Sequence, residues 1–387
     1  MTEVAIGTVR HLLAAPDDAP HAAVLATARG AGHKLAGTLL SLRAAGGERL
    51  TGAEAAELAA ARERVERYAA VWSGLTARIP GLLVVKGMAI GAFYPPGVLR
   101  SAGDLDVVCS DHEAFWAAAL QLADSGWEMV AFTLLPARRD DHVSPHLFAE
   151  FRTDAGDGAE PYVVGLVTAE VFTDLRRPAC RLPRPVHSPL AVTTLALVAE
   201  RWEREFRSRD LLDLTLLLRE LDAAGVAELR AGLALAGLWP EWCEAMDRVG
   251  RLGWRPAVVL PDARRAAARE RVLRAGRAVR RWCSPVRLLA GLARAGAEDD
   301  VSGWRTAFYD AASDLLHLRV GTRRLLAAGV PLFAVPLDER PDTTPGLDLV
   351  TVGRHLVART PLGVFLIAAG AVRQEWLDEV GGDPVEA

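Results

Sequence analysis

Lysine is almost absent from this chain of 387 residues. Lys34 and Lys86 are the only lysines among its 45 basic residues, and arginine fills the other positions. Compositional bias readily replaces lysine where positive charge is only solvated, but the compact ammonium group is not interchangeable with arginine at a specific site. Lys86 follows the apolar run 82–85 and precedes Gly87. It is therefore a candidate site residue, with chance survival at a helix start as the alternative.

Cysteine is also scarce. The four cysteines, Cys109, Cys180, Cys243 and Cys283, lie far apart in the sequence and form no C-x-x-C pair. Such spacing excludes the usual zinc-binding patterns and a disulfide framework. A reducing, cytoplasmic location is the expectation that fits free thiols.

Long hydrophobic runs and signature nucleotide loops are missing as well. Residues 1–10 include Glu3 and no apolar core of signal-peptide length, and the apolar stretch 361–372 is shorter than the ~20 residues of a membrane helix. Neither a P-loop nor a G-x-G-x-x-G motif is present, which argues against a P-loop ATPase and a Rossmann dehydrogenase. The net charge of −4 gives no general attraction to polyanions. We expect a soluble protein without a membrane or nucleic-acid partner.

The residues that are abundant favour helices and a large core. Hydrophobic residues make up 51% of the chain, and alanine, leucine and arginine dominate. Helical periodicity predicts an N-terminal helical region over 1–80 and a helical domain over 189–330. Between them, 81–188 reads as an α+β core, and 331–387 is a C-terminal extension with one strand, a loop and a final helix. Strands are predicted at Leu82–Val85, Leu105–Cys109, Leu147–Arg152, Tyr162–Thr168 and Val330–Pro336.

Segment 264–294 is rich in arginine, with ten arginines against one acid, Glu270. It is either a helix that binds a polyanion or a solvated helix face with apolar packing at Val272, Leu273 and Val279. The second interpretation is favoured, because the single aromatic residue offers too little for base stacking.

Two aspartates at alternate positions carry the main chemical signal. Asp104 and Asp106 flank Leu105, so on a strand their side chains share one face. Adjacent carboxylates repel unless a cation intervenes. Magnesium commonly takes one or two carboxylates together with phosphate oxygens and water. Gly87 lets backbone N–H groups approach a phosphate, and Lys86 and Arg100 add positive charge. These are the components of metal-assisted phosphoryl or nucleotidyl transfer.

The run VVKGMAIGAFYPPGVLRSAGDLDVV, residues 84–108, resembles the signature of a family of bacterial nucleotidyltransferase-like proteins in the polymerase-beta-type superfamily. That signature reads roughly L-K-G, a helix ending in Y-P, then R-x-x-x-D-[IL]-D-[LV]-[LV]. The resemblance extends over about residues 55–225 and includes a leucine-rich helix at 209–218. The matching motif residues are Lys86, Gly87, Tyr94, Pro95, Arg100, Asp104 and Asp106.

The resemblance implies a fold, a cofactor and a reaction. The expected fold is α+β, a small mixed sheet flanked by helices. Asp104 and Asp106 are expected to bind Mg²⁺ at the triphosphate of a nucleotide, with ATP the expected NTP. Lys86 and Gly87 contact phosphates, and Arg100 either does the same or pairs with an aspartate to orient it. The protein is then a transferase that moves NMP to a hydroxyl or phosphate of an unidentified small-molecule, peptide or protein acceptor.

A third carboxylate is the open question. In the superfamily it stands on a following strand and activates the acceptor, but segment 162–169 places Gly165 or a valine there. Glu150 on the preceding strand is the candidate substitute, and Glu170 is another if the register differs. Loss of a positioned base typically costs about 10²–10⁴-fold in rate. The alternative function is therefore a degenerate nucleotidyltransferase that binds nucleotide or substrate as an accessory protein, for example in natural-product or peptide modification.

Overall fold

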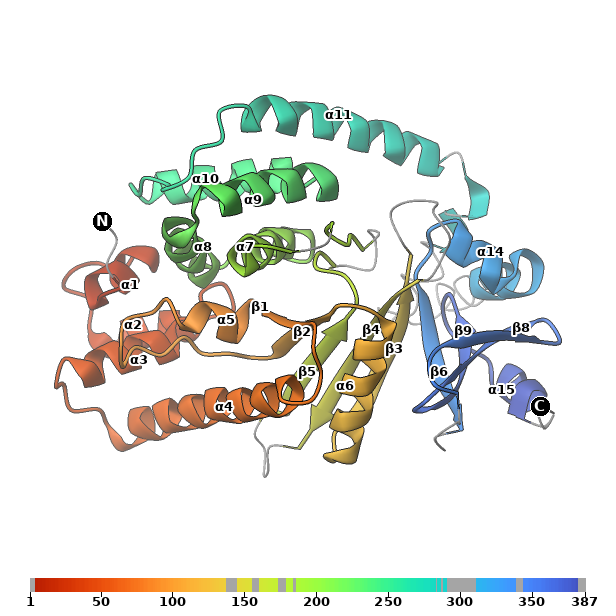
Figure 1. Ribbon diagram of the computed structural model, residues 1–387. Helices are drawn as coiled ribbons and strands as arrows, with labels where there is room; N and C mark the ends of the chain where they lie inside the picture. Colours follow the sequence, from red (N-terminus) through yellow and green to blue (C-terminus); the bar gives the residue numbers. More distant parts are fainter. Residues whose placement is uncertain are drawn as a thin grey trace.

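The fold is a large mixed sheet covered by helices, seen here in a computed structural model (Figure 1). The structure describes residues 4–136, 145–154, 160–172, 179–183, 186–282, 284–286, 288–290, 311–338 and 344–381. Within those ranges the sheet has nine strands in the order β1-β2-β5-β4-β3-β6-β9-β8-β7. Strands β2 and β5 run parallel, and the other neighbours run antiparallel. The α+β class predicted from the sequence is confirmed.

The sheet is assembled from two parts of the chain. The first part supplies β1 (Leu82–Val85), β2 (Leu105–Cys109), β3 (Glu128–Leu135), β4 (His146–Thr153) and β5 (Tyr162–Val167). The second supplies β6 (Leu332–Asp338), β7 (Asp348–Val352), β8 (His355–Thr360) and β9 (Gly363–Ala368). The predicted strands are all present, but β3 and β7–β9 were not foreseen. Pairing of β3 with β6 joins the two parts, so the C-terminal extension continues the core sheet.

Helices lie on both faces of the first part of the sheet (Figure 1). Thr51 begins α4 with a capping box: the Glu54 amide donates to Oγ1 of Thr51 at 3.3 Å, and the Thr51 amide donates to Glu54 at 2.8 Å. The helices are α1 (Ile6–Leu12), α2 (His21–Arg29), α3 (Ala36–Ala45), α4 (Gly52–Thr76), α5 (Gly87–Gly91), α6 (His112–Asp124), α7 (Pro189–Ala199), α8 (Ser208–Glu220), α9 (Ala223–Ala236), α10 (Trp239–Arg251), α11 (Ala263–Trp282), α14 (Thr322–Ala327) and α15 (Gln374–Gly381), with the 3₁₀ turn η1 (Glu200–Trp202) and the π-turn η2 (Leu316–Val320).

Alternation along β2 decides which side the site faces. Leu105 and Val107 are buried in the core that contains residues of α4 and α6, whereas Val108 belongs to the core that contains residues of α7 and α8. Successive side chains of a strand point to opposite faces. Asp106, between Leu105 and Val107, therefore projects toward the α7–α8 side.

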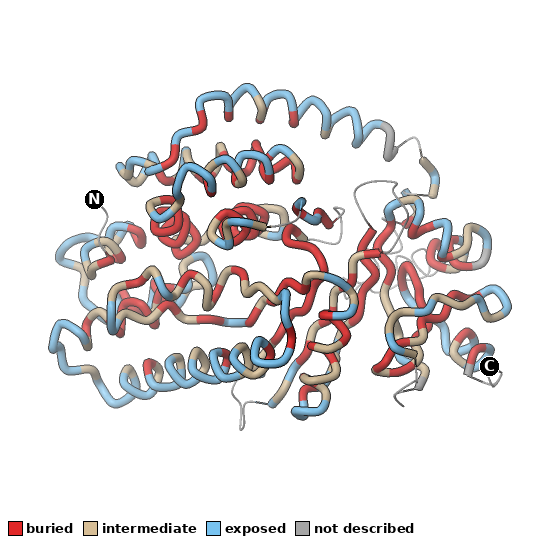
Figure 2. Tube along the Cα trace, in the orientation of Figure 1, coloured by how far each residue is buried: buried red, intermediate tan, exposed pale blue. Residues whose placement is uncertain are grey.

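Helix α11 lies along the outside of the molecule and is largely exposed (Figure 2). Val272 and Val279 are 71% and 63% exposed, so the predicted apolar packing of these residues is wrong. Several arginines are instead held by acids: Arg274 donates to both oxygens of Glu241, at 2.6 and 2.7 Å. Some of the arginines in this segment therefore form ion pairs with acidic residues of α10.

A buried pair of histidines joins the C-terminal strands to α15. Nε2 of His317 and Nδ1 of His355 are 2.7 Å apart, and Nε2 of His355 lies 2.9 Å from Glu379. The His317 ring stacks on Trp376, with centroids 4.0 Å apart. Burial, together with the charges of His355 and Arg354, lowers the pKa of His317 to about 4.

The histidine pair predicts a loss of stability in mild acid. His317 is 3% exposed, and its folded pKa lies below its usual 6.5, so the unfolded chain takes up a proton first as the pH falls. At about 1.36 kcal/mol per unit, this costs up to about 3 kcal/mol between pH 6.5 and pH 4. His317→Phe keeps an aromatic ring on Trp376 but does not titrate. Urea denaturation across that pH range should give a shallower decline for the variant, and equal slopes would contradict this role.

Candidate functional site

Lys86 occupies a backbone conformation that few residues other than glycine adopt. It joins β1 to α5 with φ 56° and ψ −140°. Lys34, the other lysine, also has a positive φ, of 53°. Residues held in such regions cost on the order of 1–3 kcal/mol and tend to cluster at functional sites. The two lysines of the chain therefore share a backbone feature that composition alone does not reveal.

The Lys86 ammonium group is enclosed by acidic residues. Its Nζ contacts Glu200 in η1 and lies 3.7 Å from Oδ2 of Asp106. The Phe172 ring covers it, with the centroid 5.8 Å from Nζ. Burial acts to lower the pKa of Lys86, but the charges of Glu200 and Asp106 more than offset it, so the pKa is raised. Lys86 is thus committed to an internal ion-pair cluster.

The same cluster changes the acidity of its carboxylates. Burial raises the pKa of Asp106 to about 7, the charge of Lys86 opposes this rise, and Asp104 and Glu200 add to it. Burial also acts to raise the pKa of Glu200, but Lys86 and Arg204 bring it below its usual value. Nη2 of Arg204 lies 2.8 Å from Glu200. Glu200 therefore stays ionised as the partner of two cations.

Arg100 is held by an aspartate of α8. Its Nε and Nη2 donate to Oδ2 of Asp213 at 3.1 and 2.8 Å, and the Tyr94 hydroxyl donates to Oδ1 at 2.7 Å. The side chains of Arg100 and Asp213 are 3% and 0% exposed. Two motif residues and the leucine-rich helix thus form one buried network. The guanidinium group of Arg100 is therefore buried and paired with Asp213, and its expected phosphate contact stays a prediction.

Gly87 permits a close approach between backbone segments. A Cβ at this position would lie 3.3 Å from the backbone oxygen of Asp104 and 3.7 Å from Nη1 of Arg100. Gly87 therefore lets the start of α5 pack against the segment that carries the aspartates. Its expected contact with phosphate stays a prediction.

The sheet register fixes the position opposite Asp106. Gly165 of β5 pairs with Asp106, and Glu150 of β4 pairs with Gly165. A Cβ on Gly165 would lie 3.2 Å from Oδ1 of Asp106 and 3.7 Å from Phe148. Glu150 shares the face of Asp106 but stands two strands away, roughly 10 Å between Cα atoms. The strand next to Asp106 thus offers no carboxylate at this register.

The two substitute acids have other partners. Nη2 of Arg152 lies 2.7 Å from Glu150. Glu170 is 1% exposed and accepts a hydrogen bond from the Leu182 amide at 2.7 Å. The sequence alternatives for a third acid are therefore an ion-paired residue on β4 and a buried residue beyond β5.

Asp104 is the exposed member of the aspartate pair. Within the part of the chain that the structure describes, its carboxylate has no ion pair or hydrogen bond. The residues close enough to affect one another electrostatically include Asp104, Lys34 and Arg207. The charge of the open Asp104 carboxylate therefore acts on Lys34 and Arg207.

Sequence reasoning missed three residues that complete this region: Lys34, Glu200 and Asp213. The rarity of lysine was a usable signal for Lys34, and the leucine-rich helix at 209–218 already contained Asp213. Glu200 had no local signal, because it contacts Lys86 across 114 residues of sequence.

The donor set fits one magnesium ion better than two. Asp104 is open, and Asp106 is shared with Lys86, which gives the one or two carboxylates that Mg²⁺ commonly takes beside phosphate oxygens. Within the described ranges, no three His, Cys, Asp or Glu side chains are grouped so that they could hold a metal ion together. A two-metal site lacks its third carboxylate there.

Comparisons with protein-family models, with curated proteins and with solved structures found no match to this chain. In the described ranges, none of the helices combines the length and the apolar character that crossing a bilayer requires. The fold and the site define the class: an α+β protein with an aspartate pair at the start of β2, the second strand of a mixed sheet.

Proposed function

We propose that this protein is a nucleotidyltransferase-like, cytoplasmic binding protein that holds a nucleoside triphosphate with Mg²⁺ at Asp104 and Asp106 and does not transfer NMP. The observation that carries the proposal is the pairing of Asp106 with Gly165. In the superfamily that the motif resembles, a following strand supplies the third carboxylate. Here the neighbouring strand supplies a glycine.

The retained carboxylates support binding. Asp104 is open to solvent, and Asp106 projects from the start of β2 with one oxygen 3.7 Å from Lys86. Bound Mg²⁺ would neutralise these carboxylates and the nucleotide phosphates at once. Lys86 keeps Asp106 in place, because it bridges Asp106 and Glu200. ATP is the nucleotide to test first, and natural-product or peptide modification is one example of a setting for such an accessory role.

Catalytic transfer to a hydroxyl or phosphate acceptor is the second candidate. Glu200 favours it, because its carboxylate lies beside Asp106 through their common partner Lys86. The strained backbone of Lys86 also fits a site under functional constraint. In this case Glu200, rather than Glu150, takes the place of the missing acid.

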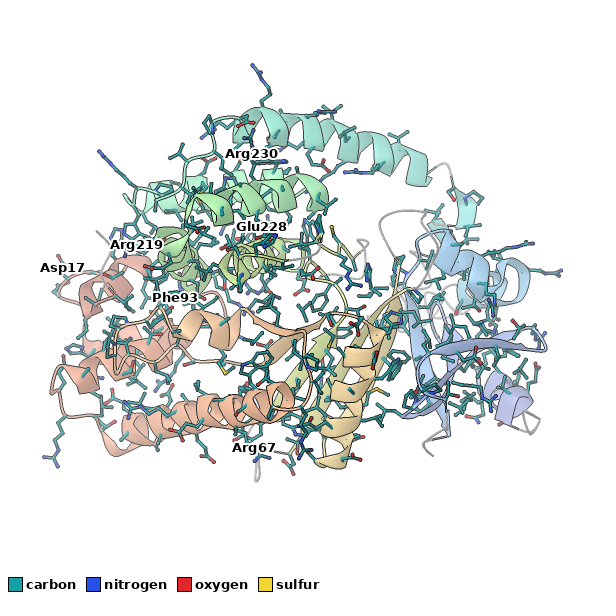
Figure 3. The ribbon with its side chains drawn as sticks, viewed as in Figure 1. Asp17, Arg67, Phe93, Arg219, Glu228 and Arg230 are labelled. Atoms are coloured by element: carbon teal, nitrogen blue, oxygen red, sulfur yellow. The ribbon has the colours of Figure 1, made fainter. Side chains whose placement is uncertain are left out.

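Removal of the open carboxylate should abolish most metal-dependent binding. A fluorescent ATP analogue titrated in Mg²⁺ should bind wild type and lose affinity on chelation with EDTA. Asp104→Asn should weaken binding in Mg²⁺ by about 10–100-fold, since a charged hydrogen-bonding or metal-ligating group contributes about 1.5–3 kcal/mol. Asp17→Asn, an exposed aspartate on the far N-terminal part labelled in Figure 3, is the matched control and should leave affinity unchanged.

A transfer assay with α-³²P-labelled ATP, Mg²⁺ and a dialysed cell extract, which supplies hydroxyl and phosphate acceptors, separates binding from transfer. Labelling of acceptors no greater than in the protein-free blank supports the binding function. Labelling that exceeds the blank and disappears in both Asp104→Asn and Glu200→Gln supports transfer of NMP to an acceptor with release of pyrophosphate. An absence of Mg²⁺-dependent nucleotide binding by wild type contradicts both candidates.

A further inference from the structure

Three segments far apart in the sequence meet beside Asp104. The Ser208 amide donates to the Gly32 backbone oxygen at 3.1 Å, and Nδ1 of His33 lies 2.7 Å from the Ser208 hydroxyl. Nη1 of Arg209 donates to the Ser101 backbone oxygen at 3.0 Å. The loop that carries Lys34, the start of α8 and the segment that leads into Asp104 are therefore held together.

This junction gathers positive charge. Lys34, Arg207 and Arg209 have no ion pair among the described residues. Arg209 is only 9% exposed, and its Nε is buried without a hydrogen-bond partner, as is Nε of Arg207. A buried donor without a partner costs about 1–3 kcal/mol, so the cluster is incomplete as it stands.

The charges of the two arginines disfavour the charged form of Lys34. Burial lowers the pKa of Lys34, and the charges of Arg207 and Arg209 lower it further, while Asp104 acts in the opposite direction. Burial and the charge of Arg204 likewise lower the pKa of Arg207. Repulsion of this kind is relieved by an anion with several negative oxygens.

The other cations of the motif are already committed. Lys86 is held by Glu200 and Asp106, and Arg100 is held by Asp213. A ligand that approaches Asp104 therefore meets Lys34 and the arginines at the start of α8. A polyphosphate that carries a metal ion fits this arrangement. Its oxygens can bind the cations, and the metal ion can bind the carboxylate of Asp104.

We propose that Lys34, Arg207 and Arg209 form a polyphosphate-binding subsite beside Asp104, and that Lys34, rather than Lys86, is the lysine that contacts the phosphates. The identification of the polyphosphate as that of a nucleotide rests on the proposed function. The subsite itself rests on the junction of the three segments and on the unpaired cations.

Inorganic tripolyphosphate in EDTA is the direct probe, because it needs neither metal nor base. Isothermal titration calorimetry should show binding to the full-length wild type. Lys34→Asn removes the charge while tolerating the positive φ at this position, and it should weaken binding at least tenfold. Arg207→Gln should weaken tripolyphosphate binding to the same extent. Lys34→Arg keeps the positive charge and should retain most of the wild-type affinity. Asp104→Asn should leave metal-free binding unchanged or tighten it, because a nearby negative charge is removed.

Two arginine variants outside the subsite test whether tripolyphosphate simply binds to any exposed arginine. Arg67→Gln lies on the exposed face of α4, where Figure 3 labels it, and Arg265→Gln lies on the arginine-rich α11; both should bind as wild type does. Equal affinity of Lys34→Asn and Arg67→Gln, or no binding of tripolyphosphate by wild type, overturns the subsite.

The two proposals fail separately. Mg²⁺-dependent ATP binding that needs Asp104 but not Lys34 overturns the subsite and leaves the proposed function standing. Tripolyphosphate binding that needs Lys34, without any Mg²⁺-dependent nucleotide binding, leaves the subsite standing and overturns the proposed function.

Discussion

Asp213→Ala is expected to lower the free energy of unfolding by about 3–5 kcal/mol, the cost typical of removing one partner from a buried ion pair. The carboxylate of Asp213 is fully buried and accepts two hydrogen bonds from Arg100 and one from Tyr94. Without it, the guanidinium group of Arg100 remains as an uncompensated charge in the core. Urea denaturation followed by circular dichroism measures the change.

Two further variants test the origin of that loss. Tyr94→Phe removes one hydrogen bond and should cost only about 0.5–1.5 kcal/mol. The double variant Arg100→Met/Asp213→Leu removes both charges and should recover much of the stability, because an apolar pair often replaces a buried ion pair at little cost. A loss below about 1 kcal/mol in Asp213→Ala would show that Arg100 reaches water or another acid.

The network around Asp213 shows what local sequence patterns do and do not predict. The strand at Leu82–Val85 and the alternation of Asp104 and Asp106 depend on neighbouring residues, and these features were foreseen. The partner of Arg100 stands 113 residues away. Rules based on the spacing of side chains along one element contain no information about such a partner.

The extent of the sheet was missed for a related reason. Strand β3 pairs with β4 along its length and with β6 through Thr133 and Leu134, which face Phe333 and Leu332 across the sheet. That second pairing depends on burial of both strands rather than on a turn between them. The resemblance to nucleotidyltransferases also ended near residue 225, so it offered no guide to the strands that follow residue 331.

The residues of the candidate site were predicted better than the contacts that they make. Motif spacing correctly brought Lys86 to Asp106, at 3.7 Å. It could not show that Glu200 also contacts Lys86, or that Lys34 approaches Asp104 from the N-terminal region. Composition and spacing thus placed Lys86 near the aspartates, while the proximity of Lys34 to Asp104 depended on tertiary packing.

Lys86→Ala is expected to lower the free energy of unfolding by about 3–5 kcal/mol, as Asp213→Ala is, because it leaves the carboxylates of Glu200 and Asp106 as buried like charges. Lys86→Gly removes the same ammonium group but relieves the strain of φ 56°, so it should be about 1 kcal/mol more stable than Lys86→Ala. Urea denaturation at pH 8 compares the two. Equal stability of both variants would contradict backbone strain at this position.

The pH dependence of the Lys86→Ala defect tests the electrostatic part of this account. In the wild type, the charge of Lys86 lowers the pKa values of both Asp106 and Glu200. Without Lys86 the folded-state pKa values of these carboxyl groups rise, so the variant loses stability as the pH increases and the buried carboxyl groups ionise without a cation between them. The difference in unfolding free energy between wild type and Lys86→Ala should therefore be larger at pH 8 than at pH 5, where protonation of Asp106 removes part of the repulsion. A difference that stays constant across this range would mean that lost packing against Phe172, rather than charge, accounts for the defect.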